Sequence, residues 1–249
     1  TDFFFPLVNH PYRQGWIGAA NTLSDLYAQG VADCDYMLML LAISREMPVH
    51  VQKICTSLIL QGFTDCCKAA GTPVTGGQTV LNPWPIVGGV ATSIVSNDEF
   101  VRPDGCRVGD VLVLTKPLGT QVAVNVHEWR HKDNEKWSQV LALISVDQVD
   151  TLVHTALCSM ARLNRNAARG MLLYHAHGAT DVTGFGLQGH AQNLCDHAVD
   201  EIGMEIDTLP CLANSMEIND HVLDFGLRRG TSAETSGGLL VSITQEDAE

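Results

Sequence analysis

Two long segments in the first half of the chain carry apolar residues at helical spacing. The first starts at His10-Pro11, contains the small residues 18–20 and runs to about Ala28, with Gly30 as its stop signal. The second covers residues 51–71 and places four residues on one line, namely Ile54, Leu58, Gln61 and Asp65. The pattern predicts two helices, and the small residues predict that the first helix packs closely against its neighbour.

Continuous apolar runs alternate with these helices and predict strands. TDFFFPLV opens the chain, DYMLMLLAI covers residues 35–43, and WPIVGGVATSIVS covers residues 84–96. Their length and their branched side chains are typical of buried strands. TPVTGGQTVLNPW, residues 72–84, predicts a short strand that breaks into a loop at its glycines.

A turn-rich stretch, PDGCRVGD, predicts a domain boundary near residue 107, so we expect domains at 1–107 and 108–249. Beyond it, DVLVLTKPLGT predicts a strand running into a helix, and an apolar helix follows at about 149–173. LQGHAQNLCDHAV predicts another helix, and ETSGGLLVSI predicts a final strand. The sequence therefore predicts an α+β fold of two domains, each a mixed β-sheet with helices packed on one face.

Composition narrows the classes of function. The 249 residues carry a formal net charge of −13, with 45% hydrophobic and 17% charged residues, which is typical of a globular protein. The negative charge argues against a general nucleic-acid surface and favours free metal or metal-nucleotide as the partner. The sequence contains no apolar run of 18 residues, so it predicts no membrane-spanning helix. Eight cysteines without a C-x-x-C pair predict reduced thiols and a cytoplasmic location.

One glycine cluster has the spacing of a dinucleotide-binding turn. In ATDVTGFGLQGHA, the glycines 184, 186 and 189 spell G-x-G-x-x-G, a helix follows, and Glu205 or Asp207 could hold a ribose. The entry segment HAHGATDVTG, however, lacks the branched apolar strand, and Asp181 would face the pyrophosphate. Two such charges at roughly 4 Å repel by about 4 kcal/mol at an effective dielectric of 20. Asp181 therefore indicates a cation site, and its alternative role is an N-cap of the following helix.

Further acids in the first half fit the same interpretation. Asn21 and Asp25 are four residues apart, so a helix places both on one face, where a carbonyl and a carboxylate suit a hard cation. Asp2 lies in a strongly apolar strand and needs a partner. The alternatives are that Asn21 and Asp25 face solvent or serve as caps, and that Asp2 is a terminal, solvated acid.

Other candidates offer weaker chemistry. His175 and His177 could ligate a transition metal, but a pair without a third soft ligand is more often a helix end. The stretch Thr75-Gly76-Gly77-Gln78 offers backbone N–H groups in a flexible turn, which could bind an anion. Lys116 follows an apolar strand, where it could reach a phosphate or simply face solvent.

Taken together, these segments resemble one family. TDFFFPLV, GAANTLSDLYAQG, VTGGQTVLNPW, LVLTKPLGTQVAV, ARLNRNAA, ATDVTGFGLQGHAQNL and ETSGGLL follow in the order and spacing of selenophosphate synthetases. These enzymes belong to the aminoimidazole ribonucleotide synthetase-like ATP-binding superfamily. The resemblance covers essentially the whole chain, and SDLYAQGV and VTGGQTVLNPW are similar to the eukaryotic branch.

The resemblance implies an enzyme that uses ATP and water to phosphorylate selenide, giving selenophosphate, AMP and phosphate, with Mg2+ bridging the nucleotide to acidic residues. Asp25 and Asp181 match metal ligands, Asp2 matches an acid at the nucleotide-metal site, and Asn21 lies beside them. Gly76, Gly77 and Gln78 match a stretch that contacts ATP from the neighbouring subunit. The resemblance also implies a homodimer formed through the strands of the first domains, and it leaves open a selenium-delivery enzyme as a further partner.

The chain also departs from the family pattern. Family members carry a Cys or Sec nucleophile, a lysine and a further metal-binding Asp before the T-D-F-F strand, and none of the eight cysteines here matches that nucleophile. We therefore expect a chain truncated at both ends, with no catalytic residue of its own and without turnover. The alternatives are a non-catalytic nucleotide-binding regulatory paralogue and, from another branch, a purine-pathway synthetase.

Overall fold

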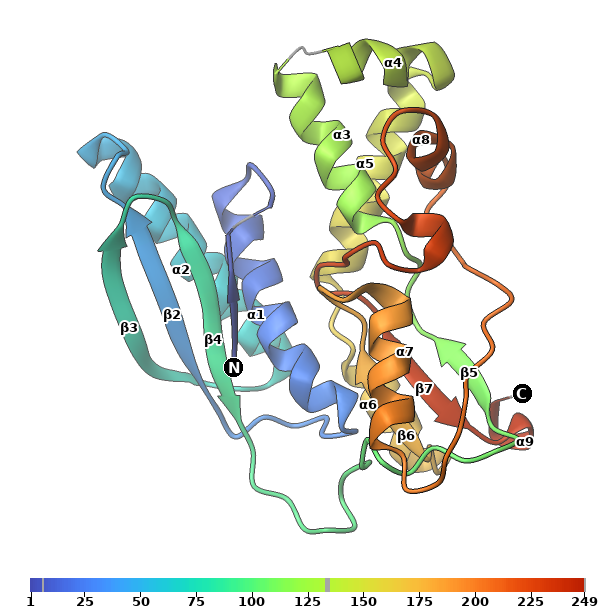
Figure 1. Cartoon of the computed structure of the whole chain (residues 1–249). Helices are drawn as coiled ribbons and strands as arrows, with labels where there is room; N and C mark the ends of the chain where they lie inside the picture. The colour runs from blue at the N-terminus through green and yellow to red at the C-terminus, as the bar shows by residue number, and fades with distance from the viewer. Residues whose placement is uncertain (6, 133–134, 249) are drawn as a thin grey trace. The chain divides into compact units, whose positions relative to one another are not determined.

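The computed structural model describes residues 1–5, 7–132 and 135–248 (Figure 1). They form two compact units, unit 1 with Thr1–Val101 and Ala161–Tyr174, and unit 2 with Arg102–Met160 and His175–Glu249. Each unit combines a β-sheet with helices, so the predicted α+β class is confirmed.

Unit 1 is built on a four-stranded sheet with the order β1-β4-β2-β3, comprising β1 (Asp2–Phe4), β4 (Ile86–Thr92), β2 (Tyr36–Ser44) and β3 (Val74–Asn82). β2 and β3 run parallel and the other pairs antiparallel, so this sheet is mixed, as predicted. β3 continues through its glycines for nine residues, and the predicted break into a loop is wrong. Pairing along the whole length of β2 supplies the backbone hydrogen bonds that hold it extended.

Helices α1 (Pro11–Ala28) and α2 (Val49–Ala70) lie against one face of this sheet (Figure 1). They touch each other through backbone, because a Cβ atom at Gly15 would lie 2.0 Å from Ile59 O and one at Gly62 would lie 1.8 Å from Tyr12 O. Gly18 packs against the Val87 side chain of β4. The close packing predicted for the first helix is confirmed, although Gly15 as well as the 18–20 stretch provides it.

The residues that α2 buries lie off the line of Ile54, Leu58, Gln61 and Asp65. Ile59, Phe63 and Cys66 are buried, whereas Ile54 keeps 59% of its surface exposed and Gln61 is also exposed. The segment has apolar residues on more than one side, so helical spacing alone does not determine which side is buried. The packing of α2 against the sheet and α1 determines it.

The helix expected at about 149–173 is two helices, α5 (Val146–Ala161) and α6 (Arg165–Leu173). Asn164 between them donates from Nδ2 to Ser24 Oγ at 3.1 Å, and Arg165 Nε donates to Ala32 O at 2.9 Å while its guanidinium pairs with Asp33. These contacts attach α6 to unit 1, whereas the sequence interpretation assigned the whole stretch to the second domain.

Unit 2 is built on a three-stranded sheet with the order β5-β7-β6, comprising β5 (Val111–Leu114), β7 (Leu239–Ile243) and β6 (Gly178–Asp181). Its described strands pair antiparallel, so the mixed sheet predicted for each domain is found in unit 1 and not in unit 2. A hydrophobic core that includes Val122, Leu152, Leu187 and Leu240 joins it to the helices of the unit. These are α3 (Thr120–Lys132), α4 (Glu135–Leu143), α5, α7 (Gly186–His197), α8 (Ser215–His221), a 3-10 turn (Leu227–Arg229) and α9 (Gln245–Ala248).

No single helix in the described residues has the length and apolar composition needed to cross a bilayer, and α4 and α5 meet that test only together, across a bend of 103°. All eight cysteines are free. Cys34, Cys66, Cys67 and Cys106 are buried, so the predicted reduced thiols fit the structure.

Candidate functional site

Asp2 and Asn21 meet where β1 packs on α1. Asp2 pairs with Gly89 in the β1–β4 register, and Asn21 Nδ2 donates a hydrogen bond to Asp2 Oδ2. Asn21 is 5% exposed and Asp2 is half-buried. The partner that an acid in an apolar strand requires is therefore present, and the solvent-facing alternative is wrong for these two residues.

Asp25 lies one helical turn beyond Asn21, with 49% of its side chain exposed. Burial by the surrounding protein raises the pKa of Asp25, and the negative charge of Asp2 adds to that shift. The amino group of Thr1, 3.6 Å from Asp25 Oδ2, opposes this shift, as a cation beside the carboxylate does. Carboxylate oxygens are hard donors that suit Mg2+. Unit 1 thus supplies oxygen donors of the kind that the implied Mg2+ takes, but no group of three or more acidic side chains in the described residues forms a complete site.

Gly76, Gly77 and Gln78 lie in β3 rather than in the predicted flexible turn. All three are exposed, and β3 is the edge strand of its sheet, paired on one side with β2. Gly77 has φ +145°, and a Cβ atom there would lie 1.9 Å from Met39 O, so this position requires glycine. Their contact with ATP stays a prediction.

Asp181 is the last residue of β6 in unit 2, 8% exposed, and pairs with Leu239 of β7. The sequence interpretation argued against a dinucleotide-binding turn because it found no strand before the glycine cluster. That argument is wrong, since β6 leads directly into the cluster. The N-cap alternative for Asp181 is also wrong, because α7 begins at Gly186 and Phe185 occupies its N-cap position.

The glycines after Asp181 shape the turn itself. Gly186 has φ +69°, and a Cβ atom there would lie 2.6 Å from Gly230 O, whereas Gly184 has open space around it. The G-x-G-x-x-G spacing here serves a reversal of the backbone and a close approach to residues 230–232. The structure of each unit holds only part of the predicted metal set, so the pairing of Asp181 with Asp25 stays a prediction.

Lys116 and Glu234 are buried charged residues near the ends of β5 and β7. Lys116 is 3% exposed and its Nζ donates to Ser236 O at 2.9 Å, so the solvent-facing alternative is wrong. Glu234 is 4% exposed and accepts the N–H groups of Gly119 at 2.7 Å and of Thr120 at 2.9 Å, together with the Thr120 hydroxyl. Burial raises the pKa of Glu234, and these hydrogen bonds oppose the shift.

Sequence reasoning missed Glu234 as a structural anchor. The signal available was an acidic residue directly before T-S-G-G and a buried strand, yet its partners are more than a hundred residues away in the chain.

His177 has a structural partner instead of a metal. Its Nδ1 lies 2.9 Å from Asp110 Oδ1, and Ser242 Oγ donates to Asp110 Oδ2 at 2.6 Å. Burial opposes ionisation of Asp110, but the hydrogen bonds from Ser242, the Arg107 N–H and His177 hold its pKa below the usual range. Across the described parts of the chain, no group of three or more His, Cys, Asp or Glu side chains is placed to hold a metal ion, so the transition-metal interpretation has no support.

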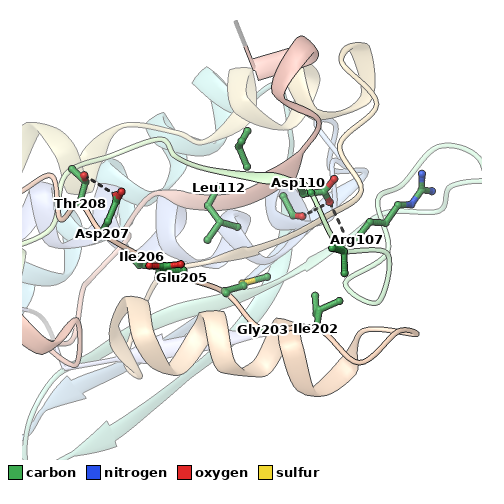
Figure 2. A pocket seen from close by; sticks show the side chains of 14 residues that line it. Arg107, Asp110, Leu112, Ile202, Gly203, Glu205, Ile206, Asp207 and Thr208 are labelled. Atoms are coloured by element: carbon green, nitrogen blue, oxygen red, sulfur yellow. Dashed lines mark hydrogen bonds between the residues drawn. The ribbon is translucent and has the colours of Figure 1, made fainter.

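A pocket of about 520 Å³ lies in unit 2 beside β5. Figure 2 shows Asp110 and Leu112 on one side and the segment 202–208 on the other. Glu205 and Asp207, considered above as ribose ligands, line this pocket and are exposed, and Asp207 Oδ1 accepts from Thr208 Oγ1 at 2.9 Å. No residue of the predicted nucleotide and metal set lines it.

Comparison with known proteins places these features in a family. Residues 1–95 match the family model of the AIR synthase related protein, N-terminal domain, and residues 107–249 match that of its C-terminal domain. The whole chain is 53% identical to a selenide, water dikinase of Dictyostelium discoideum, covering 68% of that protein. The chain belongs to the selenide, water dikinase family. It is also 51% identical to human selenide, water dikinase 2, of which it spans 55%.

Solved structures support the fold of this family member. An Aquifex aeolicus thiamine monophosphate kinase matches with a TM-score of 0.70 at 19% identity, covering 98% of this chain and 78% of that one. The hydrogenase maturation protein HypE of E. coli also has a TM-score of 0.70, at 14% identity, covering 99% of this chain and 71% of that one. At these identities the likeness establishes a shared fold, and the predicted AIR synthetase-like class is confirmed.

Proposed function

We propose that this chain is the nucleotide- and metal-binding core of a selenide, water dikinase, an enzyme that uses ATP and water to phosphorylate selenide, giving selenophosphate, AMP and phosphate. The observation that carries this proposal is the 53% identity, over the whole chain, to a protein of that name. Asp25 on α1, Asp2 on β1 and the buried Asp181 support it, because a protein with a net charge of −13 needs a cation to hold phosphates.

In this proposal Asp25 and Asp181 hold Mg2+, with Asp2 and Asn21 beside the nucleotide. When bound, the ion neutralises phosphate charge and orients the nucleotide. Asn21 orients Asp2 through their hydrogen bond, and the raised pKa of Asp25 is offset once a cation is bound. Lys116, buried and held by Ser236, contributes a positive charge in unit 2.

The test is calorimetry with Mg2+ and a non-hydrolysable ATP analogue. Asp25→Asn and Asp181→Asn keep the shape of each side chain and remove its charge, so both should weaken metal-dependent binding. Asp33→Asn is the matched control in unit 1, since Asp33 is exposed and pairs with Arg165. Metal dependence that survives in both site variants would remove Asp25 and Asp181 from the site.

We also propose that the protein forms a homodimer through the strands of unit 1, with Gly76, Gly77 and Gln78 reaching the partner's nucleotide. Phe3 of β1 and Leu40 of β2 are both paired with Gly88 of β4, so they lie on the same face of the sheet. Met39, next to Leu40, is buried on the opposite face, which the helices cover. Phe3 is 57% exposed and Val80 on β3 is 52% exposed. Such apolar area on a sheet favours a two-fold partner. Sedimentation at micromolar concentration should give twice the 27.0 kDa chain mass, and a monomer would contradict the proposal.

Residues 1–249 by themselves should bind nucleotide without forming selenophosphate, because none of the eight cysteines matches the family nucleophile. Phosphorus NMR of a reaction with selenide and Mg-ATP under anaerobic, reducing conditions tests this. Selenophosphate formed at the rate of a longer family member would show that the catalytic groups lie within these residues.

A further inference from the structure

The turn that follows Asp181 is held by hydrogen bonds to both backbone polar groups of Thr183. The Thr183 N–H donates to His190 Nε2 at 3.0 Å, and the Thr183 carbonyl oxygen accepts from the Glu234 N–H at 2.9 Å. One residue earlier, the Val182 N–H donates to Gly238 O at 2.9 Å. Both polar backbone groups of Thr183 are therefore engaged by segments outside the turn.

His190 can make this contact only as a neutral imidazole. Accepting an N–H at Nε2 requires that this nitrogen carry no proton, so the proton of the neutral ring lies on Nδ1. The side chain is 8% exposed, and burial lowers the pKa of His190, which favours the neutral ring. The Thr183 hydroxyl also lies 3.3 Å from Nε2, so both polar groups of Thr183 that could donate approach the same nitrogen.

The glycine cluster explains why this residue is in reach. The backbone reverses at Gly186 with φ +69°, and α7 then places His190 on its second turn. A Cβ atom at Gly184 would meet nothing within 4 Å, so no close approach requires glycine there. The bond to His190 therefore ties the Thr183 N–H to α7, two residues after Asp181, while the Gly186 N–H donates to the Thr183 carbonyl oxygen at 3.1 Å.

We propose that His190 is a positioning residue: by accepting the Thr183 N–H, it fixes the turn that orients the Asp181 carboxylate toward the nucleotide-bound metal. This inference rests on the proposed role of Asp181 as a metal ligand. A carboxylate at a strand end keeps its direction only if the backbone after it is fixed, and partners one step removed from a metal ligand commonly change metal affinity when they are lost.

The test measures binding of Mn2+ to the full chain, in the presence of a non-hydrolysable ATP analogue, by the EPR signal of free Mn2+. His190→Ala should weaken binding by roughly 10- to 100-fold. His190→Gln places an amide oxygen near the position of Nε2 and should restore most of the affinity. His197→Ala is the matched control, because His197 is exposed on the last turn of the same helix.

A second readout reports on the turn directly. Hydrogen exchange of the Thr183 amide should accelerate in His190→Ala and stay slow in His190→Gln. Binding is compared below the midpoint of thermal unfolding of each variant, because His190→Ala leaves a buried N–H without its acceptor. Weakened Mn2+ binding in His190→Ala that His190→Gln fails to rescue would overturn the positioning role, as would parental affinity in His190→Ala while Asp181→Asn loses binding. Parental affinity in Asp181→Asn would instead overturn the proposed metal site itself, so the two failures are distinguishable.

Discussion

Glu234 provides the sharpest test of how the buried polar groups hold unit 2 together. Its carboxylate accepts two backbone N–H groups at the start of α3, from Gly119 at 2.7 Å and from Thr120 at 2.9 Å. In Glu234→Ala both donors lose their acceptor in a site that is 4% exposed. The Thr120 hydroxyl keeps a second contact, because it also accepts from the Thr235 N–H at 3.1 Å.

The expected loss follows from these contacts. Each unsatisfied buried N–H costs about 1–3 kcal/mol, which gives about 2–6 kcal/mol for two. Removing a buried negative charge returns part of this, as the raised pKa of Glu234 indicates, so we expect about 2–4 kcal/mol. At about 2–4 °C per kcal/mol for a chain of this size, the midpoint of thermal unfolding should fall by roughly 5–15 °C.

The assay is thermal and urea unfolding followed by circular dichroism, with hydrogen exchange at Gly119 and Thr120 as the local readout. Glu234→Gln keeps one acceptor oxygen and the side-chain volume without the charge, so its free energy of unfolding should lie between those of the parent and Glu234→Ala. The exposed Glu201→Ala is the control and should unfold as the parent does. Stability of Glu234→Ala within about 0.5 kcal/mol of the parent, the usual range for surface substitutions, would refute the reasoning.

Three further predictions concern packing and pH. Gly62→Ala should destabilise unit 1 by about 1–3 kcal/mol or more in urea unfolding, because its Cβ would lie 1.8 Å from Tyr12 O. As a control, Ala69→Gly at an exposed position of the same helix should cost only about 1 kcal/mol. Burial lowers the pKa of His190 below its ordinary value of 6.5, so the unfolded chain binds more protons: the stability from this group is complete above pH 6.5 and is lost as pH falls below it. The free energy of unfolding of the parent minus that of His190→Gln should therefore decrease from pH 7.5 to 5.5. A difference that stays constant would contradict a neutral His190 ring. Asn164→Ala removes the hydrogen bond between Asn164 and Ser24 and should lower the free energy of unfolding by about 1–2 kcal/mol. Amide hydrogen exchange should then be faster in α6 than in α5. Equal protection of the two helices would argue against this hydrogen bond as the anchor of α6.

The sequence by itself determined the α+β class, the positions of most strands and helices, and the family. Helical spacing and the stop at Gly30 gave α1 within a residue or two, and apolar runs gave β2 and β4, because these signals are local. The acids Asp2, Asp25 and Asp181, with Asn21 beside them, were also recognisable as candidates, since a carboxylate in an apolar or phosphate-facing setting stands out in a sequence.

Only the tertiary structure decided which groups meet across long distances in the chain. β3 stays a strand through two glycines because β2 pairs with it, and α2 buries Phe63 rather than Ile54 because α1 and the sheet cover that side. Glu234 reaches Gly119, and α6 joins unit 1, through contacts between residues more than a hundred positions apart. Local propensity carries no information about such partners, since the free energy of a buried hydrogen bond or a helix contact depends on atoms that the chain brings together only when it folds.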